Sequence, residues 1–177
     1  MSEKQPSTQQ PVNGISSYRL FTNSAFQPHF NLMLPTNWLF HYIVWENEKT
    51  NWVSITGPLD DEAGHNNSIH ITITENADEG RPLSDLVQLS IRNKMIGKCS
   101  NASIDSIIIS GHEAREISVK CSSTNPFRNT MGIYHHQWTI FQHDSYILTI
   151  HYSATDRDFV KYVGAYKKAI DTFSLLP

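Results

Sequence analysis

The chain has 177 residues, of which 39% are hydrophobic and 18% are charged, and its formal net charge is −3. These values are typical of one globular domain that is large enough to bury a core. They argue against a nucleic-acid-binding protein, which usually carries a basic field. No apolar run reaches the length of about 18 residues that a membrane-spanning helix needs.

The first 16 residues are polar and show no hydrophobic periodicity. We therefore expect a disordered tail over residues 1–16, followed by a single domain over residues 17–177. The tail contains no apolar segment of the kind found in signal peptides, which predicts a cytoplasmic protein. A chain whose signal had been removed would read the same, so a periplasmic or secreted location stays open as the alternative.

The first half of the chain reads as strands. The alternating stretch that begins at Phe30 ends at Pro35, as expected of a strand terminus. Two apolar aromatic runs, Trp38 to Trp45 and Trp52 onward, flank a polar turn and predict a hairpin.

Two further patterns follow the hairpin. Residues 57–67 contain Gly, Pro, Asp and paired Asn, which predicts a loop. Over residues 68–75, three isoleucines alternate with hydroxyl side chains and a histidine, which indicates a half-buried strand.

Two amphipathic helices are expected. Pro82 marks a helix start and Gly97 a helix end, and apolar residues between them recur at helical spacing. These apolar residues are Leu83, Leu86, Val87, Ile91 and Met95. The last helix is predicted over residues 156–173, with Thr155 as its N-cap. Its expected apolar stripe consists of Phe159, Val163, Tyr166, Ile170 and Phe173.

Between the helices we expect a strand at 104–110, a turn at Gly111-His112, a strand at 113–120, a loop at 122–129 and a final aromatic hairpin at 132–152. The hairpin connections predict a mostly antiparallel sheet of about six or seven strands. Two amphipathic helices must then cover it. The predicted class is therefore α+β.

The chain has two cysteines, Cys99 and Cys121, each between a lysine and a serine. We expect two free thiols in a reducing compartment. The alternative is one disulfide, which would close a loop of about 22 residues and stabilise the fold by roughly 3 kcal/mol. No histidines at ligand spacing support a zinc site.

Several landmarks together resemble the PsbP/DcrB-like α/β/α sandwich superfamily over roughly residues 18 to 176. They are Phe30-x-Leu-x-Leu-Pro-x-x-Trp38, Leu83-Ser-Asp-Leu-Val, Ile109-Ser-Gly-His-Glu-Ala114, the aromatic hairpin and Tyr166-x-x-x-Ile-x-x-x-Phe. The superfamily includes photosystem II extrinsic subunits, bacterial lipoproteins, a Ran-release factor and chaperone-adaptors for secreted effectors.

The resemblance implies a non-catalytic accessory protein that binds other proteins, in the form of a chaperone or adaptor for a secreted effector. It implies no cofactor. It gives no partner identity.

The aromatic hairpin carries the candidate partner surface. Aromatic residues recur in interface hot spots because they bury much area at a small cost in side-chain entropy. The candidate residues are Trp38, Phe40, Tyr42, Trp45 and Trp52. They could equally belong to the core of the sandwich.

A second hypothesis is a small-molecule or metal-binding protein that uses a His/Thr-rich sheet face. Its residues are His70, His135 or His136, and His151, with the threonines beside them. A half-exposed polar face explains the same pattern, because His135 and His136 are consecutive and point to opposite sides of a regular strand. We therefore assign no metal ligand.

No catalytic signature is present. Ser110-Gly111-His112-Glu113 combines hydroxyl, imidazole and carboxylate, but a working triad converges from different elements, so a turn explains it better. The acidic groups Asp60-Asp61-Glu62 and Asp78-Glu79 read as solvated loops. The sequence therefore predicts a binding protein rather than an enzyme.

Overall fold

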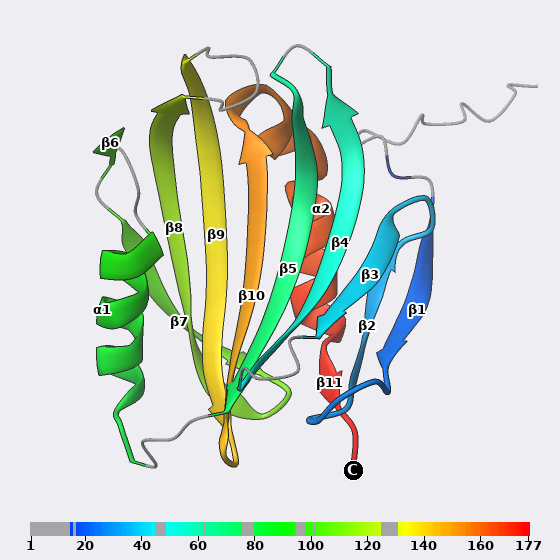
Figure 1. Cartoon of the computed structure of the whole chain (residues 1–177), viewed down its shortest axis with the longest axis vertical. Helices are drawn as coiled ribbons and strands as arrows, with labels where there is room; N and C mark the ends of the chain where they lie inside the picture. Colours follow the sequence, from blue (N-terminus) through cyan, green and yellow to red (C-terminus); the bar gives the residue numbers. More distant parts are fainter. Residues whose placement is uncertain are drawn as a thin grey trace, which may run out of the picture.

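The chain folds into two antiparallel sheets and two helices (Figure 1), as described by a computed structural model. The structure describes residues 15, 17–44, 49–61, 63–75, 80–94, 98–100, 102–124 and 131–177. The predicted α+β class and the dominance of antiparallel pairing are confirmed.

The elements follow the predicted order with longer strands. The first half contains β1 (Tyr18–Asn23), β2 (Phe30–Pro35), β3 (Leu39–Val44), β4 (Thr50–Asp60), β5 (His65–Glu75) and α1 (Leu83–Lys94). The second half contains β6 (Lys98–Cys99), β7 (Ser103–Ile109), β8 (His112–Thr124), β9 (Met131–His143), β10 (Tyr146–Thr155), α2 (Asp156–Thr172) and β11 (Ser174–Leu175).

Eight strands form the large sheet, in the order β3-β4-β5-β10-β9-β8-β6, with β7 also paired to β8. A separate small sheet has the order β1-β2-β11. The expected antiparallel sheet of about six or seven strands is therefore confirmed by the large sheet, and the separate small sheet is an addition that the sequence did not indicate. The β1–β2 hairpin lies in its own layer, since it pairs with the C-terminal β11 rather than with β3.

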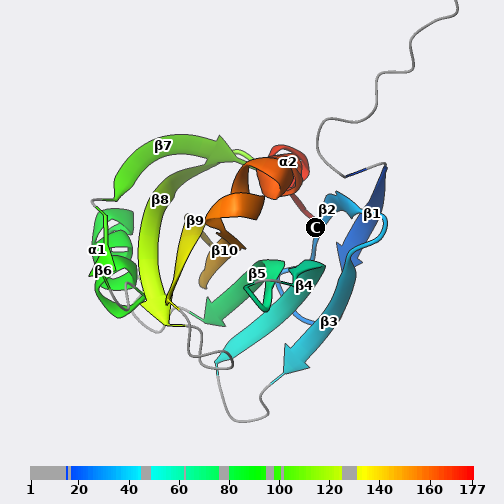
Figure 2. The ribbon, with the colours of Figure 1, turned by 90° about the horizontal axis from the view of Figure 1, so that it is seen from above.

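The inner face of the large sheet carries the main core. Alternate residues of β5, Ile69, Ile71 and Ile73, are at most 1% exposed, as the sequence pattern predicts. The small sheet and α2 cover this face, and Figure 2 shows both inside the curve of the large sheet. Aromatic stacking joins the layers: Phe30 of β2 lies 5.1 Å from Phe173 at the end of α2.

The outer face has a smaller core beneath α1. Val87 of this helix packs with Ile117, Val119, Trp138 and Ile140, which belong to β8 and β9. Figure 2 places α1 on the side of the sheet opposite to α2. No described helix or strand covers the outer face of β3, β4, β5 and β10. None of the described helices is long and apolar enough to cross a membrane.

The predicted loop at 57–67 is mostly strand. β4 continues to Asp60 and β5 begins at His65, and the register shifts between Thr56 and Leu59. Gly57 and Pro58 therefore mark a β-bulge. Glycine and proline are typical of loops as well as of bulges, so the sequence pattern predicts a loop here. Likewise β8 extends to Thr124 into the loop predicted at 122–129; residues 125–130 lie outside the described residues.

The predicted stripe of α2 is displaced. The buried helical residues are Asp158, Tyr162, Ala165, Tyr166 and Ala169, while Phe159, Val163 and Ile170 are only partly buried. The two alanines bring the helix close to the sheet, so larger apolar residues flank the contact instead of forming its centre. Of the expected α1 stripe, Met95 and the capping Gly97 lie outside the described residues.

Polar contacts fix the start of α2. Thr155 is the N-cap, as expected, and its hydroxyl accepts a hydrogen bond from the backbone N–H of Asp158. The same hydroxyl donates to the buried carboxylate of Asp60 at 2.8 Å, and Arg157 forms an ion pair with that carboxylate. The β4–β5 turn and the helix start therefore support each other.

Cys99 and Cys121 form a disulfide, so the expectation of two free thiols is wrong. The bond joins the short β6 to β8, where the two residues are register partners. The sequence did not reveal this neighbourhood, because β6 is only two residues long.

Removing the disulfide tests its role in stability. We expect a Cys99→Ala/Cys121→Ala variant to lose about 3 kcal/mol of unfolding free energy, because the unfolded chain regains the freedom of a loop of about 22 residues. Urea unfolding with and without a reductant measures this. Reductant should destabilise the wild type and leave the variant unchanged; a wild type that ignores reductant would contradict the prediction.

The contact between Gly57 and Trp38 tests the packing at the bulge. A Cβ on Gly57 would lie 2.5 Å from Cε2 of Trp38, whose side chain is 1% exposed. We expect Gly57→Ala to lower the unfolding free energy by about 1–3 kcal/mol through overpacking. In a Trp38→Phe background the same substitution should lower the unfolding free energy much less, because phenylalanine is smaller than the indole that Gly57 contacts. Equal costs in both backgrounds would rule out this contact as the cause.

Candidate binding surface on the outer face of the large sheet

The structure separates the five aromatic residues of the predicted partner surface. Trp38 is 1% exposed and belongs to the main core, so it cannot form part of a surface in this state. Its ring packs edge-on against Tyr162 of α2, with centroids 6.3 Å apart. Trp45 lies outside the described residues.

Phe40 and Tyr42 lie on the inner side of β3, at the corner where β1 approaches. The Phe40 ring is 4.7 Å from that of Phe21, and the Tyr42 hydroxyl donates a 3.3 Å hydrogen bond to the Thr22 carbonyl. Arg19 places its guanidinium over the Phe40 ring. Phe40 nevertheless remains 41% exposed, so its ring is accessible at the edge of the sheet.

Trp52 lies on the opposite, outer side. Its register partners are Ile43 on β3 and Thr72 on β5, and alternation along these strands places all three on the face that α1 leaves uncovered. Trp52 is 39% exposed and Leu39 of β3 is 72% exposed. The aromatic hairpin therefore presents apolar groups on both sides of one edge.

β3 is the terminal strand of the large sheet, and no described strand pairs with its second edge. Its sequence, Leu-Phe-His-Tyr-Ile-Val, contains no proline and no lysine. Edge strands usually carry such residues, or a bulge, because unpaired N–H and C=O groups attract another chain. This edge lacks these protections.

The histidines of the second hypothesis form a row on the outer face. His70 of β5 and His151 of β10 are register partners, with ring centroids 6.1 Å apart. His136 of β9 follows, and its Nδ1 lies 3.1 Å from Nε2 of His151, within hydrogen-bond distance. His135 points away and contacts Asp156 at the start of α2.

Trp138 is the residue of this cluster that sequence reasoning missed. Its ring stacks on His151 at 4.9 Å and on His136 at 5.4 Å. Alternation along β9 indicates that His136 and Trp138 share a face, but only the register with β10 shows that His151 joins them. The three rings continue the small core beneath α1 toward the uncovered half of the sheet.

Burial keeps part of this row neutral. Loss of solvation, with smaller contributions from the neighbouring His65 and His135, lowers the pKa of His136 to about 4. Burial likewise lowers the pKa of His70, with His41 and His65 as smaller causes. Among the described residues, no group of three His, Cys, Asp or Glu side chains is arranged to hold a metal ion.

Two of the remaining candidate groups, Ser110 and Asp60, have structural partners. Ser110 and Gly111 form the turn before β8 with positive φ angles of 49° and 81°, and the Ser110 hydroxyl accepts a hydrogen bond from the backbone of Leu175. Asp60 is buried against Arg157, and Asp78 and Glu79 lie outside the described residues.

Comparisons with known proteins identify the fold. No family model matches the sequence, and no curated protein does. Solved structures match over nearly the whole chain. The cyanobacterial PsbP (CyanoP) of Synechocystis sp. PCC 6803 is 11% identical, covers 97% of this chain and 100% of its own, and gives a TM-score of 0.59.

Two further structures give similar values. LpqN of Mycobacterium tuberculosis, described as involved in cell envelope biogenesis, is 11% identical with a TM-score of 0.61, covering 92% of this chain and 93% of its own. PA94 of Pseudomonas aeruginosa, a putative regulator of unknown function, is 18% identical with a TM-score of 0.58, covering 92% and 98%. The expected resemblance is therefore confirmed for the fold, which is PsbP-like.

The neutral His136 predicts a pH dependence of stability. The folded pKa of about 4 lies below the usual value of about 6.5 for histidine, so the unfolded chain binds more protons between these values. This contribution is fully present above about pH 6.5 and disappears as the pH falls toward 4; its upper limit is about 3 kcal/mol.

Urea unfolding at a series of pH values from 4 to 7 measures the effect. We expect His136→Gln to reduce the slope of the unfolding free energy against pH in this window. Part of the slope should remain, because burial also lowers the pKa values of His70 and His65. The control is His29→Gln, on the β1–β2 connection and outside this row of histidines, which should leave the slope nearly unchanged. If His136→Gln and the wild type show the same slope, the imidazole of His136 does not cause the pH dependence of stability.

Proposed function

We propose that this chain with a PsbP-like fold is a non-catalytic accessory protein that binds an extended segment of another protein along the free edge of β3. The observation that carries the proposal is the unprotected edge of β3, flanked by exposed apolar side chains on both faces of the sheet.

Main-chain geometry supplies the affinity of such a contact. The six residues of β3 already hold an extended backbone through their pairing with β4, so only the incoming segment loses conformational freedom on binding. An added strand would satisfy the backbone donors and acceptors along the second edge.

Side chains beside the edge define the kind of partner. Leu39 and Trp52 offer apolar contacts on the outer face, and Phe40 offers one on the inner face beside Arg19. A strand alternates its side chains, so the favoured segment carries apolar residues on both faces. An acidic residue near Arg19 would add a charge contact.

The disulfide supports a location in an oxidising compartment rather than the expected cytoplasm, since such bonds are rare in reducing compartments. The description of LpqN as involved in envelope biogenesis agrees with this proposal. An adaptor or chaperone for a secreted effector is the form of the function that the superfamily resemblance implies. We propose no reaction for the chain.

Site-specific photo-crosslinking in the producing cell tests the proposal. A crosslinker at Leu39 or at Trp52 should give a discrete adduct with one protein, identified by mass spectrometry. The matched control is Val160, an apolar residue on α2 that is 76% exposed and far from β3 in the chain. It should give no such adduct.

The captured partner then allows a quantitative measurement with purified proteins. We expect Trp52→Ala to weaken binding by tenfold or more, about 1.4 kcal/mol, as for an interface hot spot. Leu39→Lys should weaken it as well, because a charge at an edge opposes strand addition. Adducts that form equally at positions 39 and 160, or an affinity unchanged by both variants, would refute the edge as the binding site.

A further inference from the structure

We propose that the open end of the sandwich, between the β1–β2 connection and the ends of β4, β5 and β10, is a second site that binds a small neutral ligand rich in hydroxyl or amide groups, such as a sugar. This site lies on the inner side of the large sheet. It is independent of the β3 edge and of the protein-binding proposal.

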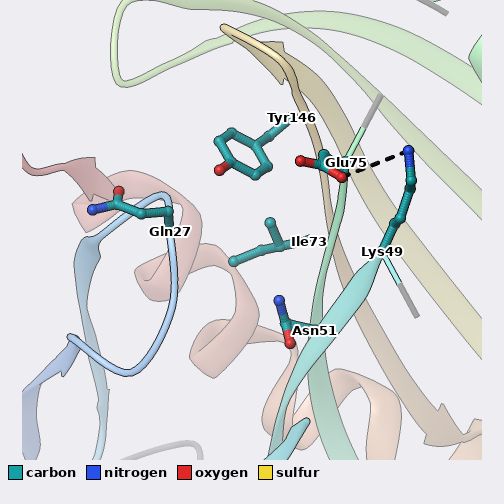
Figure 3. Close-up of a pocket in the computed structure, with 6 residues that line it drawn as sticks. All are labelled: Gln27, Lys49, Asn51, Ile73, Glu75 and Tyr146. Carbon is teal, nitrogen blue, oxygen red and sulfur yellow. Dashed lines mark ion pairs between the residues drawn. The ribbon is translucent and has the colours of Figure 1, made fainter. Parts of the chain in front are cut away.

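A cavity of about 210 Å³ occupies this end of the molecule (Figure 3). It is lined by Gln27, Lys49, Asn51, Ile73, Glu75 and Tyr146. A second cavity of about 440 Å³ shares Gln27 and Tyr146 with it and extends toward His143, Asp144 and the last three residues of the chain. The two cavities together offer room for a ligand larger than one sugar ring.

Paired strands hold most of the wall. Asn51 and Ile73 are register partners on β4 and β5, and Tyr146 on β10 is the register partner of Glu75. Ile73 is 1% exposed and lies at the inner end of the cavity. The side chains of Asn51, Glu75 and Tyr146 therefore stand on a rigid frame of paired strands, and the surface of the cavity is mainly polar.

Several polar groups in this wall have unused hydrogen-bonding capacity. Neither the side-chain amide of Asn51 nor the hydroxyl of Tyr146 has a hydrogen-bond partner among the described residues, although both side chains are partly buried. Lys49 Nζ and Glu75 Oε2 are 3.8 Å apart, an ion pair without a close hydrogen bond. Donors and acceptors both remain available there.

The charge of the wall selects the ligand class. In the smaller cavity Lys49 and Glu75 balance each other, so its wall carries no net charge, while the larger cavity adds the carboxylate of Asp144 beside His143. Amide, carboxylate, ammonium and phenol groups together match a ligand whose groups each donate and accept. Neighbouring hydroxyls on an apolar ring have this character, and the ring of Tyr146 provides a surface for its apolar side.

Saturation-transfer NMR with the full chain tests the proposal. The probes are glucose, mannose and N-acetylglucosamine, with citrate and alanine as charged comparisons. We expect transfer to at least one sugar and none to citrate or alanine. Asn51→Ala and Tyr146→Phe should each weaken sugar binding about tenfold, the effect of one lost hydrogen bond.

Thr50→Ala is the matched control, because Thr50 adjoins Asn51 on β4 but pairs with Thr74 on the opposite face of the sheet. Its affinity for the sugar should equal that of the wild type. Thermal melts check that each variant folds. Absence of transfer to all three sugars, preference for citrate or alanine, or binding insensitive to both Asn51→Ala and Tyr146→Phe would overturn the proposal.

Discussion

The structure depends on the burial of the inner face of the large sheet. An eight-stranded sheet exposes two faces, and α2 and the small sheet cover most of one of them. The short helix α1 shields β8 and β9 on the other side. The remaining strands must therefore stabilise their outer face themselves, which explains the mixture of hydroxyls, stacked imidazoles and tryptophan found there.

This uneven cover also accounts for the two places at which ligands could approach. The terminal strand β3 lies beyond the reach of α1, and among the described strands it pairs with β4 only. Within the part of the chain that the structure describes, the small sheet spans only part of the inner face and leaves a cavity at the ends of β4, β5 and β10, beside the connection between β1 and β2. Both places exist because the layer formed by α2 and the small sheet is narrower than the large sheet.

Much of the fold could be predicted from local patterns. The alternation of Ile69, Ile71 and Ile73, the spacing of apolar residues in both helices and the cap at Thr155 each follow from interactions between near neighbours in the chain. Features that depend on distant pairing could not be read in the same way. A hairpin such as β1–β2 looks identical in either sheet, and Gly57-Pro58 suits a loop as well as a bulge.

The candidate surface shows the same division. Alternation separates His135 from His136, but the meeting of His136 with His151 requires the register of β9 and β10. The aromatic residues of the hairpin were recognisable as a group. Their separation into core, corner and outer face depends on where β1 and α2 pack, which composition does not encode. The disulfide similarly requires that β6 lies beside β8.

The pairing of β11 with β2 has a consequence for biosynthesis. Ser174 aligns with Asn31, so the second layer joins residues from opposite ends of the chain. During translation, β1 and β2 leave the ribosome long before β11, so the small sheet is completed late. Until β11 has been synthesised, β2 lacks its second partner strand and its apolar residues depend on protection from aggregation.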